Sequence, residues 1–279
     1  MRLSALFSII RPVNALVSGL TAILAYLIAT GTIIPGTVLL FLIVLCITGA
    51  GNTINDYYDA AIDRINRPSR PIPSGTITER GALFWSLTLF TLGVILSLFT
   101  NVFCAAIAVV NSLVLILYAA RLKGIALAGN LAVAYLTGSI FLFGAVYAGI
   151  PAIIPVLPIA LITFFGTLGR ELLKDAEDIT GDAAGGAKTL AVSLGIQKTG
   201  ILALVSLIIA VGSSLVPAGY WGAGYLLLIL PVDCLILAAG LLAVRCTTPG
   251  DLVCSRATSL LKAGMFAALA VFAVSAVLF

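Results

Sequence analysis

The sequence predicts an all-α membrane protein: a bundle of nine transmembrane helices with two Asp-rich cytoplasmic loops. The first observation is composition, because 61% of the residues are apolar and only 9% are charged, which differs strongly from a soluble domain. The second is a series of apolar runs, each near the ~20 residues that a helix needs to cross a bilayer. The third is the placement of the charged residues, all but one of which lie outside these runs.

The apolar runs define the expected helices. A helix rises 1.5 Å per residue, so about 20 residues cross ~30 Å of hydrocarbon. The expected spans are residues 13–30, 36–54, 81–100, 102–120, 125–148, 151–169, 199–216, 220–244 and 263–279. We interpret the first run as a helix that stays in the bilayer and not as a cleaved signal peptide. We expect a single domain over residues 1–279, made of two four-helix halves and a ninth helix.

The basic residues all fall in one of the two sets of connections that alternating helices create. This set contains all 15: Arg2, Arg11, Arg64, Arg67, Arg70, Arg80, Arg121, Lys123, Arg170, Lys174, Lys188, Lys198, Arg245, Arg256 and Lys262. By the positive-inside rule, the N-terminus and any active site are cytoplasmic and Phe279 is outside. Ten of the 11 acidic residues share this face. The exception, Asp233, lies in a span, where we expect a hydrogen bond between helices and not a proton relay.

Several classes of site and function are excluded by composition. A net charge of +4 from 15 scattered basic residues does not form a nucleic-acid-binding stripe. The chain has no histidine, and its five cysteines show no paired spacing, so zinc, haem, disulfide and catalytic histidine sites are not expected. No P-loop or G-x-G-x-x-G motif supports nucleotide binding. The sequence therefore leaves the acidic residues as the chemical groups of interest.

The first acidic segment follows the second expected helix. It reads N-T-I-N-D-Y-Y-D-A-A-I-D-R-I-N-R-P-S-R-P-I-P-S-G. If the helix continues, Asn55, Asp59 and Asp63 form one stripe at i, i+4 and i+8, and Asp56 lies beside it. Stacked carboxylates repel one another, so this register predicts a bound cation rather than a solvated helix end.

The second acidic segment follows the sixth expected helix and reads R-E-L-L-K-D-A-E-D-I-T-G-D-A-A-G-G-A-K-T-L. Asp175, Asp178 and Asp182 lie at i, i+3 and i+7 on one face, with Glu171 one turn earlier. Glu177 points elsewhere, and we expect it to be a solvated partner of Arg170 or Lys174. Two acidic stripes on the same membrane face indicate a shared role.

The chemistry of these residues favours magnesium. Clusters of carboxylate and amide oxygens select hard cations, and Mg²⁺ typically takes one or two carboxylates together with phosphate oxygens and water. Two such clusters are suited to a diphosphate held through bridging ions. The charge that remains can be neutralised by basic side chains from the same connections: Arg67, Arg70, Lys123 and Lys188.

The motifs closely resemble the UbiA superfamily of intramembrane prenyltransferases over nearly the whole chain. The resemblance lies in N-D-x-x-D-x-x-x-D followed by R-P-x-P-S-G, and later in K-D-x-x-D-x-x-G-D followed by G-x-x-K-T-L. It implies metal binding by Asn55, Asp56, Asp59, Asp63, Asp175, Asp178 and Asp182, among which Asp59, Asp63, Asp178 and Asp182 are the catalytic carboxylates. It also implies substrate contacts at Arg11 in R-P-V-N, Asn55, Tyr118 and Lys123, and with Asn14 and the basic residues above the expected substrate-binding set is Arg11, Asn14, Asn55, Arg67, Arg70, Tyr118, Lys123 and Lys188.

Within the superfamily, the R-P-V-N opening and N-x-x-N-D-Y-Y-D most resemble archaeal digeranylgeranylglyceryl phosphate synthases. This resemblance implies transfer of a geranylgeranyl group from its diphosphate to the hydroxyl of geranylgeranylglyceryl phosphate. The partners would then be a prenyl diphosphate, a lipid-like acceptor and the membrane itself. An aromatic acceptor such as 4-hydroxybenzoate or a naphthoate is the alternative. An ion-coupled transporter is a remote alternative, since only Asp233 lies within a span.

Overall fold

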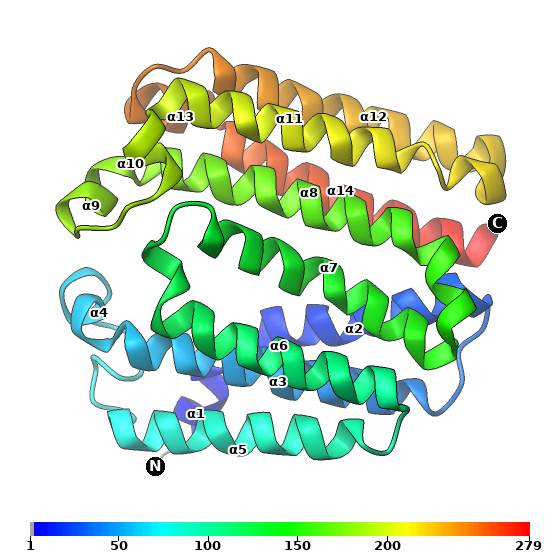
Figure 1. Ribbon diagram of the computed structural model, residues 1–279, viewed down its shortest axis with the longest axis horizontal. Helices are drawn as coiled ribbons and strands as arrows, with labels where there is room; N and C mark the ends of the chain where they lie inside the picture. The colour runs from blue at the N-terminus through cyan, green and yellow to red at the C-terminus, as the bar shows by residue number, and fades with distance from the viewer. Residues whose placement is uncertain (1–2) are drawn as a thin grey trace. The chain divides into compact units, whose positions relative to one another are not determined.

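The computed structural model describes residues 3–279, and the regular secondary structure of these residues is helical (Figure 1). The long helices are α2 Pro12–Thr30, α3 Thr37–Tyr58, α5 Glu79–Ser97, α6 Val102–Ala120, α7 Ala128–Ala148, α8 Ile153–Glu177, α11 Ile196–Ser214, α12 Ala218–Val244 and α14 Ala257–Leu278. The short elements are α1 Leu3–Ile9, α4 Ala60–Asn66, η1 Leu122–Gly124, η2 Ile150–Ala152, α9 Ile179–Ala184, α10 Leu190–Leu194 and α13 Pro249–Ser255.

The long helices confirm the expected architecture. Among residues 3–279, nine helices are long and apolar enough to cross a membrane, one for each expected span, and the chain is a multi-pass membrane protein. The largest difference is at α8, which continues to Glu177 although the prediction ended the span at residue 169. The prediction stopped at the first charged residue, but a helical backbone continues readily where side chains reach the membrane surface.

The acidic residues of the two segments lie on helical backbone, whereas the prediction placed them in loops. Those of the first segment are at the end of α3 and on α4, and those of the second are at the end of α8 and on α9. Ordered helical backbone satisfies its own hydrogen bonds at the membrane surface, which an irregular loop would leave to water. The acidic side chains are therefore held at fixed positions on helices.

The described chain divides into two compact units. Unit 1 contains the residues up to Arg121 together with Ile140–Ala152, and unit 2 contains Leu122–Ser139 and Ile153–Phe279. One boundary, between Arg121 and Leu122, lies between the fourth and fifth spans, and a second lies inside α7, between Ser139 and Ile140. In unit 1, Asn101 at the start of α6 donates to the Val146 carbonyl oxygen of α7 at 2.8 Å.

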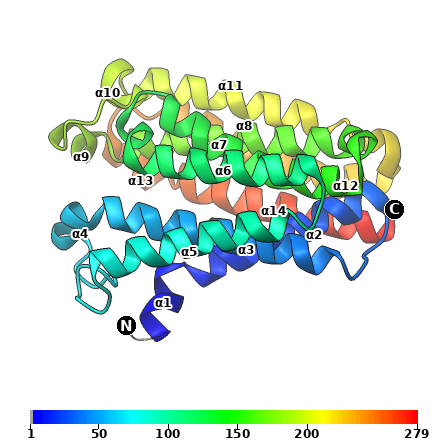
Figure 2. The same cartoon turned by 60° about the horizontal axis from the view of Figure 1, so that its bottom comes forward.

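In unit 1 the central helix is α3. It packs against α2, α5 and α6, and α5 runs alongside it in both views (Figures 1 and 2). Its most apolar window is 61% buried, compared with 28% for α2 and α6. The short helix α1 also packs against α3, and Ala5 and Ile9 join a small core with Ile72, Ile77 and Ala82. The end of α3 that carries the first acidic segment is thus fixed on several sides.

In unit 2 the helix α8 packs against α11 and α14, while α12 packs against the same two helices (Figure 1). A polar contact joins α11 to α12 within the apolar interior. The Ser214 hydroxyl donates to Asp233 at 2.6 Å, and the Tyr225 hydroxyl donates to the Ser214 carbonyl oxygen at 2.7 Å. The prediction that Asp233 makes a hydrogen bond between helices is therefore confirmed.

Within each unit the basic residues gather at one set of helix ends. In unit 1 these are the start of α2, the segment between α3 and α5, and the end of α6; in unit 2 they are the corresponding ends of α7, α8, α11, α12 and α14. The expectation for Arg2 lies outside the described residues. Each unit therefore has one charged end and one uncharged end, as alternating helices predict.

Gly144 illustrates how closely the helices of unit 1 approach. A Cβ built on Gly144 of α7 would lie 2.6 Å from the Ala25 Cβ of α2 and still closer to the Ala22 carbonyl oxygen. Small residues at such contacts are the usual means of packing membrane helices, because apolar side chains gain little from leaving lipid.

We therefore predict that Gly144→Ala lowers the unfolding midpoint in detergent, since overpacking of this kind costs about 1–3 kcal/mol. The matched control is Gly212→Ala on α11, where a built Cβ meets nothing within 4 Å. This control should keep or raise the midpoint, because alanine has the higher helix propensity. Equal midpoints for the two variants in a thermal melt would contradict the close approach.

Candidate active site

The first acidic segment is almost one continuous helix. α3 ends at Tyr58 and α4 begins at Ala60, and Asp59 between them keeps a right-handed helical conformation (φ −82°, ψ −1°). Asp59 N donates to the Asn55 carbonyl oxygen, and Asp63 N donates to that of Asp59, both at 2.9 Å. The expected stripe of Asn55, Asp59 and Asp63 is thus built into the backbone. Along it, the Asn55 amide donates to the Asp59 carboxylate at 2.9 Å.

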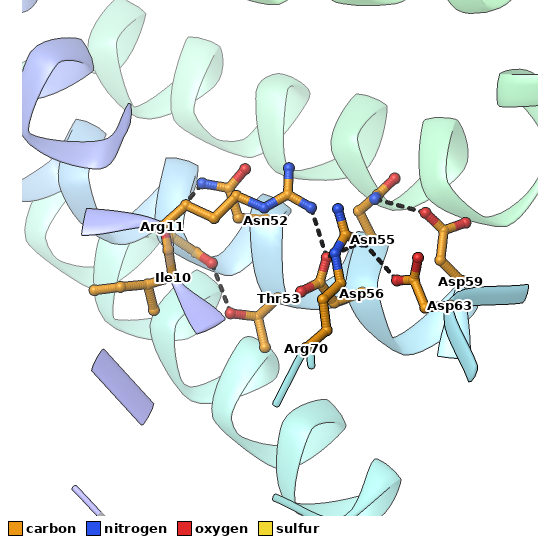
Figure 3. Close-up of polar contacts among 10 residues, drawn as sticks. Ile10, Arg11, Asn52, Thr53, Asn55, Asp56, Asp59, Asp63 and Arg70 are labelled. Atoms are coloured by element: carbon orange, nitrogen blue, oxygen red, sulfur yellow. Dashed lines mark hydrogen bonds and ion pairs between the residues drawn. The ribbon is translucent and has the colours of Figure 1, made fainter. Parts of the chain in front are cut away.

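Two arginines converge on the carboxylates of this segment (Figure 3). Arg11 donates to Asp56 Oδ1 at 2.6 Å, and Arg70 donates to the same oxygen at 3.2 Å. Arg70 also donates to Asp63 at 2.5 Å. Asp56 and Asp63 are only 4% and 5% exposed, and a charge so buried is strongly unfavourable unless an opposite charge lies beside it. The two arginines supply that charge.

Arg70 reaches the aspartates because the R-P-x-P-S-G segment turns back over α4. Arg67 N donates to the Asp63 carbonyl oxygen at 2.8 Å, and Arg70 N donates to that of Arg67 at 3.0 Å. Beyond Arg70, the buried side chains of Ile72 and Ile77 anchor the turn in the small core beneath α1. Arg67 itself is exposed at the end of α4.

The second acidic segment begins on the last turns of α8. Asp175 accepts a hydrogen bond at 2.8 Å from the amide of Asn130, which is 6% exposed on α7. Asp178 lies exposed between α8 and α9, and Asp182 is half-buried on α9. Helical hydrogen bonds of 3.0 Å from Asp178 N to the Lys174 carbonyl oxygen and 2.9 Å from Asp182 N to that of Asp178 preserve the expected register.

Asp182 lies in a partly desolvated and charged environment. Burial, followed by the negative charge of Asp178, raises the pKa of Asp182 above its usual value. A hydrogen bond from Thr189 and the positive charges of Lys174 and Lys123 oppose that rise. The pKa of Asp182 remains raised, so this carboxylate has less compensation than its burial requires and favours a further cation nearby.

Lys123 belongs to a loop that pairs with the second segment. Ile125 forms an isolated parallel bridge with Lys188, and Lys188 N donates to the Gly124 carbonyl oxygen at 3.0 Å. Both lysine side chains are exposed. The backbone therefore brings the two expected diphosphate-binding lysines together with Asp182 in unit 2.

Two further residues of the expected substrate-binding set lie on long helices. Asn14 is exposed on the first turn of α2, and Tyr118 is half-buried near the end of α6.

The prediction for Glu177 was wrong. Its carboxylate accepts a hydrogen bond of 2.5 Å from Thr258 on α14, while Arg170 pairs with Glu171 at 2.8 Å. The cause is the unexpected length of α8, which turns Glu177 toward α14.

Sequence reasoning missed Asn130 altogether. The available signal was an amide side chain in the first turn of an apolar span, where a polar group needs a partner.

The donor set fits a hard divalent cation. The two segments offer carboxylate and amide oxygens, which are the ligands that Mg²⁺ prefers. Among the described residues, however, no three acidic side chains converge in a metal-coordinating arrangement. In the first segment Arg70 bridges Asp56 and Asp63, and the Asn55 amide donates to the Asp59 carboxylate. Other oxygen ligands are therefore needed to complete a metal site.

Comparison with known proteins gives a consistent identification. The model of the UbiA prenyltransferase family matches residues 18–269. The digeranylgeranylglyceryl phosphate synthase of Methanoregula boonei is 54% identical over 277 residues, which cover 99% of each chain.

Solved structures agree with this match. One described as digeranylgeranylglyceryl phosphate synthase in membranes is 36% identical, with a TM-score of 0.87 and 99% coverage of both chains. A UbiA homologue from Archaeoglobus fulgidus bound to GPP and Mg²⁺ shares the fold at 18% identity, with a TM-score of 0.60 and coverage of 96% of this chain and 99% of its own. The chain belongs to the UbiA prenyltransferase family.

Proposed function

We propose that the chain transfers a geranylgeranyl group from geranylgeranyl diphosphate to the free glycerol hydroxyl of geranylgeranylglyceryl phosphate. The observation that carries this function is the 54% identity to the Methanoregula boonei synthase over 99% of both chains. In the reaction the allylic C–O bond to diphosphate breaks and a C–O ether bond to the glycerol oxygen forms. The hydroxyl proton passes to a base. We propose that residues 1–279 act as one domain in this reaction.

The acidic segments are the proposed metal ligands. Asn55, Asp59 and Asp63 on the first segment, and Asp175, Asp178 and Asp182 on the second, hold Mg²⁺ together with oxygens of the substrate diphosphate. When bound, Mg²⁺ neutralises the charge that develops on the departing diphosphate. The Archaeoglobus fulgidus homologue bound to GPP and Mg²⁺ supports this choice of metal and ligand class.

The basic side chains complete the proposed diphosphate site. Arg11 and Arg70 lie at the first segment, while Lys123 and Lys188 lie at the second. Each can donate charge-assisted hydrogen bonds to phosphate oxygens, and such donors are most effective where diphosphate charge increases during bond breaking. Asn14, Arg67 and Tyr118 remain proposed substrate contacts.

We further propose that the charged ends of both units face the cytoplasm. All the described basic residues lie at those ends, and the positive-inside rule then gives this orientation. The substrates carry long isoprenoid chains, so both would reach the site from the membrane.

The first prediction of this proposal concerns product and metal. Purified chain with radiolabelled geranylgeranyl diphosphate, Mg²⁺ and geranylgeranylglyceryl phosphate should form a labelled, doubly prenylated lipid phosphate. EDTA should abolish turnover, and Mg²⁺ or Mn²⁺ should restore it, whereas Zn²⁺ should serve poorly without His or Cys ligands.

Substituting 4-hydroxybenzoate or a naphthoate for the lipid acceptor tests the alternative acceptor. Prenylation of only the aromatic acceptors would contradict the proposed acceptor. Full activity in EDTA would contradict the metal assignment.

A second prediction separates catalytic carboxylates from other acids. Single Asn substitutions at Asp59, Asp63, Asp178 and Asp182 should each lower turnover roughly 10²-fold or more, because each removes a charge that stabilises the departing diphosphate. The control is Glu79→Gln, since Glu79 forms an exposed pair with Arg64 at 2.5 Å, and such pairs contribute little.

The Asp59, Asp178, Asp182 and Glu79 variants should unfold at similar temperatures in detergent, whereas Asp63→Asn should unfold at a lower temperature because it breaks the buried ion pair with Arg70. If Asp178→Asn and Asp182→Asn fold and retain normal turnover while Asp59→Asn is inactive, the second segment has no catalytic part.

The third prediction concerns orientation. Single cysteines at Ser74 and Ala184 should react with an impermeant thiol reagent only from the cytoplasmic side. Single cysteines at Thr32 and Ala218 should react only from outside. The background for these variants lacks the five native cysteines, two of which are exposed. Labelling of either pair from the opposite side would overturn the proposed orientation.

A further inference from the structure

We propose that Asp56 is a positioning residue that fixes the guanidinium group of Arg11 for the substrate diphosphate, and that it does not coordinate the metal ion. This inference rests on the proposed function, and it separates Asp56 from the other carboxylates of the first acidic segment. Four observations carry it: the backbone of Arg11, its attachment to α3, the ion pairs of Asp56, and the register of α3.

The backbone at Arg11 is unusual. Arg11 has φ 51° and ψ 71°, in the left-handed region that residues other than glycine rarely occupy. Pro12 follows, and a residue before proline strongly prefers extended backbone. Strain of this kind persists only where the surrounding structure enforces it, and it is common at functional sites.

The surrounding structure does hold this junction. The Asn52 amide on α3 donates to the carbonyl oxygen of Ile10 at 2.9 Å, and Arg11 N donates to that of Ser8 at 3.1 Å. Figure 3 shows Ile10 and Arg11 beside Asn52 and Asp56. The chain between α1 and α2 is therefore attached to α3 immediately before the arginine.

The ion pair fixes the other end of the arginine. The Arg11 guanidinium donates to Asp56 at 2.6 Å, where the Asp56 side chain is 6% exposed and that of Arg11 is 35% exposed. The carboxylate is thus enclosed while part of the arginine remains accessible. Arg70 also contacts Asp56, but at 3.2 Å, and it has a second and shorter contact with Asp63 at 2.5 Å. Asp56 therefore holds Arg11 more closely than it holds Arg70.

The register of α3 places Asp56 apart from Asn55 and Asp59. Asn52 and Asp56 are separated by one helical turn and both contact the junction between α1 and α2. Asn55 and Asp59 form the neighbouring stripe and contact each other. One stripe thus positions the arginine, and the adjacent stripe offers amide and carboxylate oxygens for a metal ion.

Arg11 and Asp56 have opposite charges, which allows a charge-balanced test. Asp56→Asn alone weakens Mn²⁺ binding by charge even if Asp56 is not a ligand. Asp56→Asn combined with Arg11→Gln removes one negative and one positive charge, so the net charge of the segment stays the same. A metal ligand cannot be replaced in this way, but a counter-ion can.

The experiment measures two ligands on the full chain in detergent. Mn²⁺ binding is followed by electron paramagnetic resonance, and binding of a geranylgeranyl thiolodiphosphate, whose carbon–sulfur bond ionises slowly, is followed by calorimetry at saturating Mg²⁺. The charge-balanced double variant should bind Mn²⁺ within about threefold of the unmutated chain, whereas Asp59→Asn should lose about 10–100-fold. Mn²⁺ binding lost in the double variant, as in Asp59→Asn, would overturn the inference.

Binding of the thiolodiphosphate is the second measurement. Asp56→Asn should weaken it about tenfold in the unmutated background and less than about threefold when Arg11 is already Gln, because residues acting through one contact are not additive. An equal loss in both backgrounds would contradict an action through Arg11.

If Asp56→Asn does not fold, Arg11→Gln alone carries the test. It should weaken thiolodiphosphate binding without weakening Mn²⁺ binding, because the loss of a positive charge favours a cation nearby, and unchanged thiolodiphosphate binding would overturn the proposal. These binding measurements need no acceptor, so the proposed reaction can fail in the turnover assay while the role of Asp56 is still decided.

Discussion

A carboxylate buried at the surface of a bilayer needs a cation beside it, and this requirement governs the acidic ends of both units. Moving an unpaired ion out of water costs several kcal/mol even after the protein relaxes. In unit 1, Arg11 and Arg70 neutralise Asp56 and Asp63. In unit 2, Asp175 accepts a hydrogen bond from the neutral amide of Asn130, and the pKa of Asp182 is raised by burial and by the negative charge of Asp178. The environment of Asp182 thus disfavours its charged form, and a divalent cation nearby would stabilise that form.

The helices give these charges fixed positions. A membrane-spanning backbone must satisfy its own hydrogen bonds, so irregular chain is tolerated only near the ends of the helices. The Asp63 N–H accordingly bonds to Asp59, and the Asp182 N–H bonds to Asp178, one turn back in each case. Close contacts such as that of Gly144 with α2 hold the helices of unit 1 together. Rigid helix ends of this kind suit a reaction that depends on placing metal ions and donors around a leaving group.

Much of the fold could be predicted from sequence because lipid imposes simple rules. Apolar length identified each span, and the segregation of basic residues supported the count. The length of α8 was missed, since hydropathy ends at Arg170 while the helix continues to Glu177. The short helix α1 was missed because seven residues give too little periodicity to recognise.

The site was partly predictable for a related reason. The spacing of Asn55, Asp59 and Asp63 gave the helical stripe, because that stripe is a local property of the chain. Arg11, which pairs with Asp56, and Asn130, which donates to Asp175, are each 45 residues away in sequence from these aspartates, and a local pattern contains no signal for such contacts. The contact of Glu177 with Thr258 likewise depends on how α8 packs against α14.

The central claim is that both acidic segments act in the same chemical step. The direct measurement is single-turnover prenyl transfer by the double variant Asp59→Asn with Asp178→Asn, at saturating Mg²⁺ and substrate, compared with each single variant. If each single change costs roughly 10²-fold, the account predicts that the double variant loses far less than the ~10⁴-fold product, because groups that act as a unit fail together. Losses that multiply fully would show that the two segments act independently and would contradict the account.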